Sequence, residues 1–125
     1  MKNHGVRKTI LIVDDEVCMR NVLEKRIASF GYETVTAKSG EECLHLVEQR
    51  PPDLILLDVM MPKKNGYEVC LEMKGDPALS DVHIIMLTAE GQQADREKAI
   101  AVEADEFVTK PFSPQEIVAR LKELA

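Results

Sequence analysis

The chain has 125 residues, of which 45% are hydrophobic and 30% are charged, a composition typical of one soluble globular domain. Its formal net charge of −6 argues against a nucleic-acid-binding surface, because phosphate contacts need a basic face. No apolar run approaches the roughly 18 residues of a membrane-spanning helix, and no signal peptide precedes Thr9. We therefore expect a cytoplasmic domain that binds neither nucleic acid nor membrane.

The three cysteines, Cys18, Cys43 and Cys70, are widely spaced and form no C-x-x-C pair. Their pattern indicates neither a zinc site nor a disulfide framework. It favours small hydrophobic side chains on helices in a reducing compartment.

Strand and helix patterns alternate along the whole chain. Aliphatic runs bounded by turn residues predict buried strands, and apolar residues at helical spacing predict the helices between them. Capping-box sequences open two helices, at Ser39–Glu42 and Ser113–Glu116, while Gly31 and Pro51 each end one. The five predicted strands are Lys8–Val13, Glu33–Ala37, Leu54–Asp58, His83–Leu87 and Glu106–Thr109. The five predicted helices span Glu16–Phe30, Ser39 to the residue before Pro51, Tyr67–Lys74, Gln92–Val102 and Ser113 to the final residues.

This alternation predicts a three-layer α/β domain, because parallel strands need helical crossovers that cover both faces of the sheet. A polar arm at residues 1–8 precedes a single folded unit over residues 9–124, with no linker or repeat. In the first helix, we expect the inward stripe to contain Met19, Val22, Leu23, the stem of Arg26, Ile27 and Phe30.

Polar residues follow four of the predicted strands at the point where each strand ends. They are Asp14, Asp15, Asp58, Thr88 and Lys110. The carboxyl ends of parallel strands meet at one edge of the sheet, so these side chains are expected to converge there. Packed carboxylates repel one another unless a cation is present, and oxygen ligands suit Mg²⁺. An ammonium and a hydroxyl beside such a metal predict a phosphoryl site, in which one carboxylate can attack phosphorus.

Each of these residues also has a purely structural interpretation. Asp15 can be the N-cap of the first helix, Asp58 can begin a turn, and Thr88 can be a turn hydroxyl. Lys110 can be a solvated charge. Their joint placement at one edge of the sheet favours a common site over five separate structural roles.

Four sequence pieces, in this order and spacing, match one protein family. The pieces are Ile12-Val13-Asp14-Asp15-Glu16, Leu57-Asp58-Val59-Met60-Met61-Pro62 with Gly66, Leu87-Thr88-Ala89, and Phe107-Val108-Thr109-Lys110-Pro111-Phe112. From about Thr9 to Leu124, the chain resembles the CheY-like receiver domain of two-component response regulators. The resemblance implies a flavodoxin-like (βα)5 fold with strand order 2-1-3-4-5.

The resemblance also implies roles for the site residues. Asp58 would accept a phosphoryl group from a sensor histidine kinase or a phosphotransfer protein. Magnesium would be held by Asp15, Asp58 and the backbone carbonyl of Met60, with Asp14 acting through water. Such a domain catalyses its own aspartyl phosphorylation and dephosphorylation, but it is a signalling module and not an enzyme with a free substrate.

In the same resemblance, Lys110 binds a phosphoryl oxygen, and Thr88, followed by Ala89, turns towards another. Phe107 stands at the aromatic switch position, and the Lys110–Pro111 peptide bond is expected to be cis. The output surface is the helix at 92–102 with the strand at 106–109 and the last helix. It would contact a downstream protein or output domain, in a monomer or a phosphorylation-dependent dimer.

The chain departs from the family at Glu103, where the family usually has glycine before Ala104-Asp105. This predicts backbone strain or a different helix end at that position. Three other functions compete with the receiver interpretation. A magnesium phosphohydrolase would need a substrate pocket, and a nucleotide- or flavin-binding domain would need a glycine-rich loop after the first strand, which is acidic here. A receiver acting only as a docking module would not need all five site residues.

Overall fold

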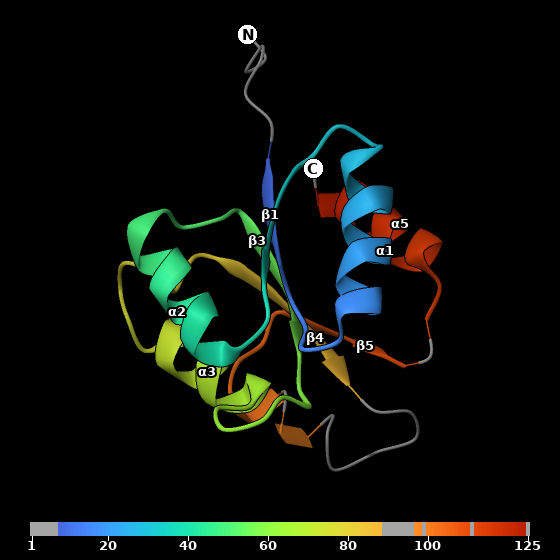
Figure 1. The fold of residues 1–125 in the computed structure, drawn as a ribbon. Coiled ribbons are helices and arrows are strands. Elements are labelled where there is room, and N and C mark those ends of the chain that lie inside the picture. The colour runs from blue at the N-terminus through green and yellow to red at the C-terminus, as the bar shows by residue number, and fades with distance from the viewer. Residues whose placement is uncertain (1–7, 89–96, 99, 111, 125) are drawn as a thin grey trace, which may run out of the picture.

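This computed structural model describes residues 8–88, 97–98, 100–110 and 112–124. Its sheet has five strands (Figure 1). All neighbouring strands are parallel, in the order β2-β1-β3-β4-β5. The strands are β1 (Thr9–Val13), β2 (Glu33–Ala37), β3 (Leu54–Asp58), β4 (His83–Thr88) and β5 (Glu106–Thr109). The predicted strands and their order are confirmed, with β1 one residue shorter and β4 one residue longer than the sequence pattern indicated.

Helices cover both faces of the sheet, which gives the predicted three layers (Figure 1). The helices are α1 (Val17–Ala28), α2 (Gly40–Gln49), α3 (Gly66–Lys74) and α5 (Pro114–Leu124). Most of the helix predicted at Gln92–Val102 lies outside the described residues, but its residues 97, 98, 100 and 101 are helical. No helix in the described part of the chain is long and apolar enough to span a membrane.

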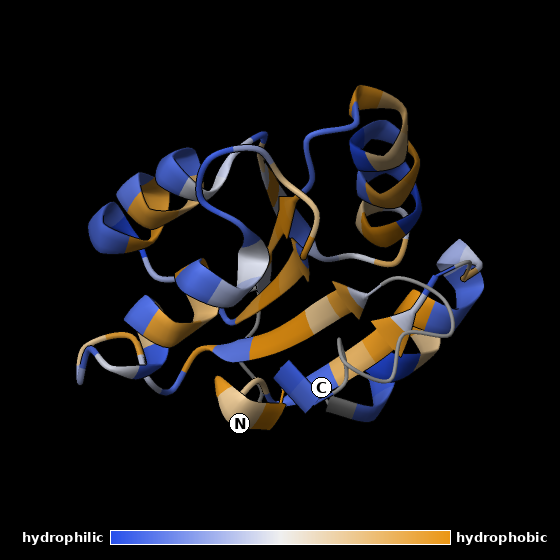
Figure 2. Ribbon diagram, turned by 90° about the horizontal axis from the view of Figure 1, so that it is seen from below, coloured by the Kyte–Doolittle hydropathy of each residue, from blue (hydrophilic) through white to orange (hydrophobic). Residues whose placement is uncertain are grey.

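The sheet separates two hydrophobic clusters, because successive side chains of a strand point to opposite faces. In β1, Leu11 and Val13 pack towards α2 and α3, whereas Ile10 and Ile12 pack towards α1 and α5. β1 and β3 are buried along their whole lengths, so the central strands read as aliphatic runs in both the sequence and the hydropathy colouring (Figure 2).

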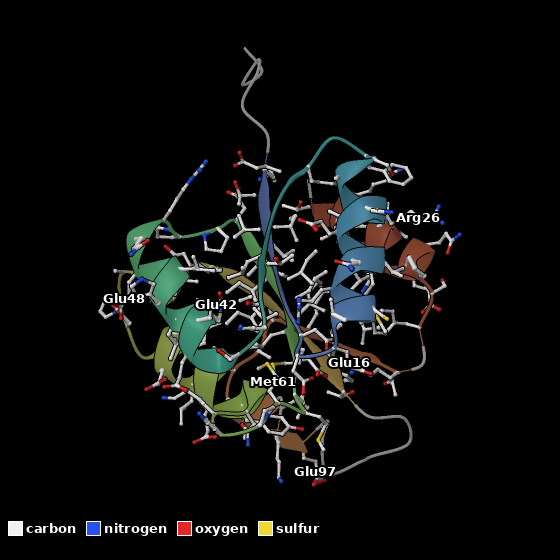
Figure 3. All side chains as sticks on the ribbon, in the orientation of Figure 1. Glu16, Arg26, Glu42, Glu48, Met61 and Glu97 are labelled. Atoms are coloured by element: carbon white, nitrogen blue, oxygen red, sulfur yellow. The ribbon has the colours of Figure 1, made fainter. Side chains whose placement is uncertain are left out.

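The inward stripe predicted for α1 is wrong in part. Leu23 and Ile27 are fully buried, but Val22 is 50% exposed, Phe30 is 47% exposed, and Arg26 is exposed (Figure 3). Helix α1 packs on one side only, where i and i+4 residues share a face, so Val22 and Arg26 turn towards solvent. Sequence spacing alone made the apolar stripe too wide.

Side-chain capping explains where α2, α3 and α5 begin. Ser39 accepts a hydrogen bond from the Glu42 amide (3.1 Å), but the Glu42 carboxylate accepts from the Lys38 amide (2.7 Å) and not from the amide of Ser39. Asn65 and Glu68 form a reciprocal capping box, so α3 starts at Gly66, one residue before the predicted start. The predicted box between Ser113 and Glu116 is confirmed.

Glu103 lies in the turn between the helical residues 100–101 and β5, and it has a φ of 64°. This left-handed conformation costs a residue with a Cβ roughly 1–2 kcal/mol relative to glycine. The strain predicted from the missing glycine is therefore present.

Candidate functional site

Three carboxylates meet at the carboxyl edge of the sheet. One oxygen from each of Asp14, Asp15 and Asp58 lies within 4.8 Å of the others. Val13 pairs with Leu57 in the β1–β3 ladder, so Asp14 and Asp58, which follow these two positions, lie side by side at the carboxyl edge of the sheet. Asp14 and Asp58 are buried, while Asp15 is exposed and is not the N-cap of α1.

A cation lies against this acidic cluster. The Lys110 ammonium is 2.7 Å from Asp58 Oδ1. The backbone N–H of Lys110 donates to the Thr88 carbonyl oxygen (2.7 Å). Thr88 pairs with Thr109 at the end of the β4–β5 ladder, which brings Lys110 to the site. The sequence placed Lys110 at this edge, and the structure pairs it with Asp58.

Burial raises the pKa of the two buried carboxyl groups, Asp14 and Asp58. Desolvation raises the pKa of Asp14 to about 6, although the hydrogen bond from the Glu16 amide (2.9 Å) opposes the rise. Desolvation also raises the pKa of Asp58 above its ordinary value, against the lowering effect of Lys110 and of the Met60 N–H. Burial lowers the pKa of Lys110, but its hydrogen bond to Asp58 and the attraction of that carboxylate outweigh burial and raise it.

Two polar atoms at the site are buried and have no hydrogen-bond partner among the described residues. They are Asp14 Oδ2 and Thr88 Oγ1. A buried, unpartnered acceptor among three carboxylates fits a hard cation that takes oxygen ligands, such as Mg²⁺. Thr88 is 0% exposed, and its hydroxyl donates to no acceptor among the described residues.

The loop that follows β3 is held tightly against the end of that strand. The Gly66 N–H donates to the Val59 carbonyl (3.1 Å), and a Cβ at Gly66 would lie 2.5 Å from the Asp58 carbonyl oxygen. Only glycine allows this approach of α3 to the end of β3. The turn fixes Met60, whose backbone carbonyl the resemblance assigns to the metal.

Arg20 is a site residue that the sequence analysis missed. Its Nη1 atom donates to the Asp14 carbonyl oxygen (2.7 Å), so the first helix holds the loop that carries the acidic pair. The available signal was a cation one turn into a helix that begins directly after Asp14-Asp15.

The structure describes Phe107, but not Ala89 or Pro111. Phe107 is half-buried and packs against the cluster on the α2 and α3 side of the sheet. Ala89 and Pro111 lie outside the described residues, so the role of Ala89 and the cis Lys110–Pro111 bond stay predictions.

Residues 10–122 match the family model for the response regulator receiver domain. The chain belongs to this family. The receiver is similar to the probable transcriptional regulator ycf27 of Cyanophora paradoxa, with 50% identity over 118 residues, 94% of this chain and 48% of that protein. The phosphate regulon transcriptional regulatory protein PhoB of Pseudomonas aeruginosa is 44% identical over 117 residues, which are 94% of this chain and 51% of PhoB. The receiver thus spans about half the length of these relatives.

Solved structures give the same family. The chemotaxis protein CheY4 of Vibrio cholerae has a TM-score of 0.89 and 28% identity, with 96% of this chain and 100% of that chain covered. The receiver domain of a histidine kinase from Syntrophus aciditrophicus has a TM-score of 0.88 and 32% identity, with 94% of this chain and 89% of that chain covered. The predicted fold and family are both confirmed.

Proposed function

We propose that this receiver is a phosphorylation-switched signalling module in which Asp58 accepts a phosphoryl group from a histidine kinase or phosphotransfer protein. The observation that carries the proposal is the buried Asp58 carboxylate with the Lys110 ammonium 2.7 Å from its Oδ1 and the unpartnered Thr88 hydroxyl at the same edge. A phosphoryl acceptor needs a nucleophile, a cation and a hydrogen-bond donor that is available to a phosphoryl oxygen.

Magnesium is the cofactor that this donor set fits best. Asp15, Asp58 and the backbone carbonyl of Met60 would hold the ion, with Asp14 acting through water. The bound ion would neutralise carboxylate charge and polarise phosphoryl oxygens. The buried Asp14 oxygen without a described partner supports this assignment.

The chain's own residues supply the remaining chemistry. A carboxylate oxygen of Asp58 attacks phosphorus, an O–P bond forms, and the P–N bond to the donor's imidazole breaks. Lys110 places its positive charge beside the negatively charged oxygens of the transferred phosphoryl group. The fixed loop from Asp58 to Gly66 keeps the acceptor in position, because Gly66 leaves no room for movement towards α3.

The response is carried by Thr88 and Phe107. A phosphoryl oxygen offers the Thr88 hydroxyl its missing acceptor, and the movement of Thr88 makes room into which Phe107 can turn. The surface of the helix predicted at 92–102, with β5 and α5, then changes shape and contacts a downstream protein or output domain. The relatives of about twice this length are transcriptional regulators, which supports an output domain as the recipient of the signal.

Acetyl phosphate and magnesium test the proposal directly. The wild-type receiver should gain one phosphate by mass spectrometry, and Asp58→Asn should gain none, because the isosteric amide is no nucleophile. Asp53→Asn is the matched control, since Asp53 lies at the amino end of β3, where its carboxylate accepts from the Thr9 amide (2.7 Å). Normal phosphate gain in Asp58→Asn would refute the assignment. Continuous release of phosphate with none retained would instead favour a phosphohydrolase.

A further inference from the structure

The loop that carries the acidic pair is short, and the helix after it begins without a side-chain cap. β1 ends at Val13 and α1 begins at Val17, so residues 14–16 form the whole connection. The N-cap residue of α1, Glu16, makes no side-chain capping hydrogen bond. The usual attachment between a helix start and the preceding loop is therefore missing here.

Three hydrogen bonds hold Asp14 in this loop. Its N–H donates to the Ala37 carbonyl oxygen at the end of β2 (3.1 Å), and its Oδ1 accepts from the Glu16 amide (2.9 Å). Its carbonyl oxygen accepts from Nη1 of Arg20 (2.7 Å), which is the only one of the three bonds that comes from a side chain. The remaining polar atom of Asp14, Oδ2, is buried and has no partner among the described residues. The three bonds thus fix Asp14 and leave one of its oxygens available.

Arg20 reaches the loop because of its position in α1. Its backbone N–H donates to the Glu16 carbonyl oxygen (3.1 Å), so Arg20 lies one helical turn after the N-cap. Long side chains on a helix point back towards its N-terminus. The guanidinium therefore extends past Glu16 to the Asp14 carbonyl, six residues earlier in the chain.

Arg20 engages this loop differently from the way in which Lys110 engages Asp58. The Lys110 ammonium pairs directly with the Asp58 carboxylate (2.7 Å), whereas Arg20 forms no ion pair with any described residue. Its bond goes to a backbone oxygen, so the carboxylates of Asp14 and Asp15 keep their negative charge for another cation. Carboxylate oxygens within 4.8 Å of one another repel, and a bond to the loop backbone opposes the movement that this repulsion favours.

We propose that Arg20 is a positioning residue for Mg²⁺. By fixing the Asp14 carbonyl, it holds the carboxylates of Asp14 and Asp15 beside Asp58, where they bind the ion. Groups that orient metal ligands in this way typically change metal affinity by about 10–100-fold. The charge of Arg20 acts in the opposite direction, because a nearby cation repels Mg²⁺. This role rests on the proposed function, since it takes Mg²⁺ as the ion of the site.

A Mg²⁺ titration of the full chain without a phosphoryl donor, followed by amide shifts, tests the proposal. Arg20→Met removes the hydrogen bond and the charge but keeps an unbranched stem and a high helix propensity, so the helix is retained. The variant should bind Mg²⁺ about tenfold more weakly than wild type. If only the charge of Arg20 mattered, Arg20→Met would bind Mg²⁺ more tightly. Equal or tighter binding in Arg20→Met would overturn the proposal.

Two further variants separate position from charge. Arg20→Lys keeps a donor and the charge, and should bind Mg²⁺ more tightly than Arg20→Met; binding no tighter would overturn the proposal. Arg26→Met removes the same charge from an exposed position further along α1 (Figure 3), and should leave binding within about twofold of wild type. Equal losses in Arg26→Met and Arg20→Met would show that the position of Arg20 is not special and would refute its role.

The wild-type titration distinguishes a failure of this role from a failure of the proposed function. Wild type that binds Mg²⁺ with shifts at residues 13–16 and 58–60, and no more tightly than Arg20→Met, would refute the role of Arg20 alone. Wild type that binds no Mg²⁺ would refute the proposed cofactor, and the role of Arg20 with it.

Discussion

Lys110 and Asp58 are 52 positions apart in the sequence, and the Lys110 ammonium lies 2.7 Å from Asp58 Oδ1. The Asp58 side chain is 2% exposed and that of Lys110 is 26% exposed, so solvent screens the pair less than it would at the surface. Their proximity follows from two ladders that end together, β3 with β4 and β4 with β5. Burial raises the pKa of Asp58, and the hydrogen bond and positive charge of Lys110 oppose that rise.

Removal of the Lys110 charge should therefore raise the pKa of Asp58 further above its ordinary value. In Lys110→Met, burial of the carboxylate is no longer opposed by a hydrogen bond and a nearby cation. A carboxyl ¹³C NMR titration measures this shift. Stability at pH 7 should also fall by about 1–3 kcal/mol, because a buried charge is left unpaired. Lys110→Arg keeps the cation and should shift the pKa less. An Asp58 titration unchanged in Lys110→Met would contradict the pairing.

The raised pKa of Asp14 predicts a pH dependence of stability in metal-free solution. The folded value is about 6 and the ordinary value is 3.8, so between these two pH values the folded protein holds more protons than the unfolded chain. The free energy of unfolding should thus decrease as pH rises through this window, by about 1–3 kcal/mol, and then level off. Asp58, whose pKa is also raised, contributes with the same sign.

Urea unfolding with a chelator, at pH values across this window, measures the effect. Asp14→Asn removes the titrating group, so its stability should depend less on pH and should exceed that of wild type at pH 7. The same slope in wild type and Asp14→Asn would assign the pH dependence to other groups.

The unpartnered Thr88 hydroxyl predicts that one substitution will stabilise the resting fold and abolish the response to phosphorylation. Thr88→Val replaces a buried, unpartnered hydroxyl with a methyl group of the same shape, which should stabilise the resting fold by about 1 kcal/mol. The same change should abolish the response of residues 97, 98 and 100–110 to beryllofluoride, followed by amide shifts. Thr88→Ser keeps the hydroxyl and should retain the response. An equal response in Thr88→Val and wild type would show that Thr88 does not couple the site to the output surface.

Glu103 predicts a stabilising substitution far from the acids. Glu103→Gly should raise the free energy of unfolding by about 1 kcal/mol, because glycine adopts a φ of 64° without strain. Glu103→Ala is the control, since it removes the carboxylate but keeps the Cβ. Denaturant unfolding of both variants separates the two effects. A gain in Glu103→Ala equal to that in Glu103→Gly would assign the stabilisation to charge and not to the backbone.

The sequence alone determined which residues meet at the carboxyl edge of the sheet. Aliphatic runs that end in Asp14 and Asp58, with helices between them, fix a parallel sheet, and parallel strands carry their terminal residues to one edge. Local patterns of this kind survive in the sequence because burial and periodicity act on neighbouring residues. The capping box at Ser113 was readable for the same reason.

Only the tertiary structure decided how these side chains engage one another. The pairing of Lys110 with Asp58 and the bond from Arg20 to the Asp14 carbonyl depend on ladder register and on side chains that reach across elements. The exposure of Val22 was equally inaccessible, because helical spacing defines a face but not how much of it a neighbouring layer covers. Lys110 and Asp58 are 52 positions apart, so no local pattern of residue types records their pairing.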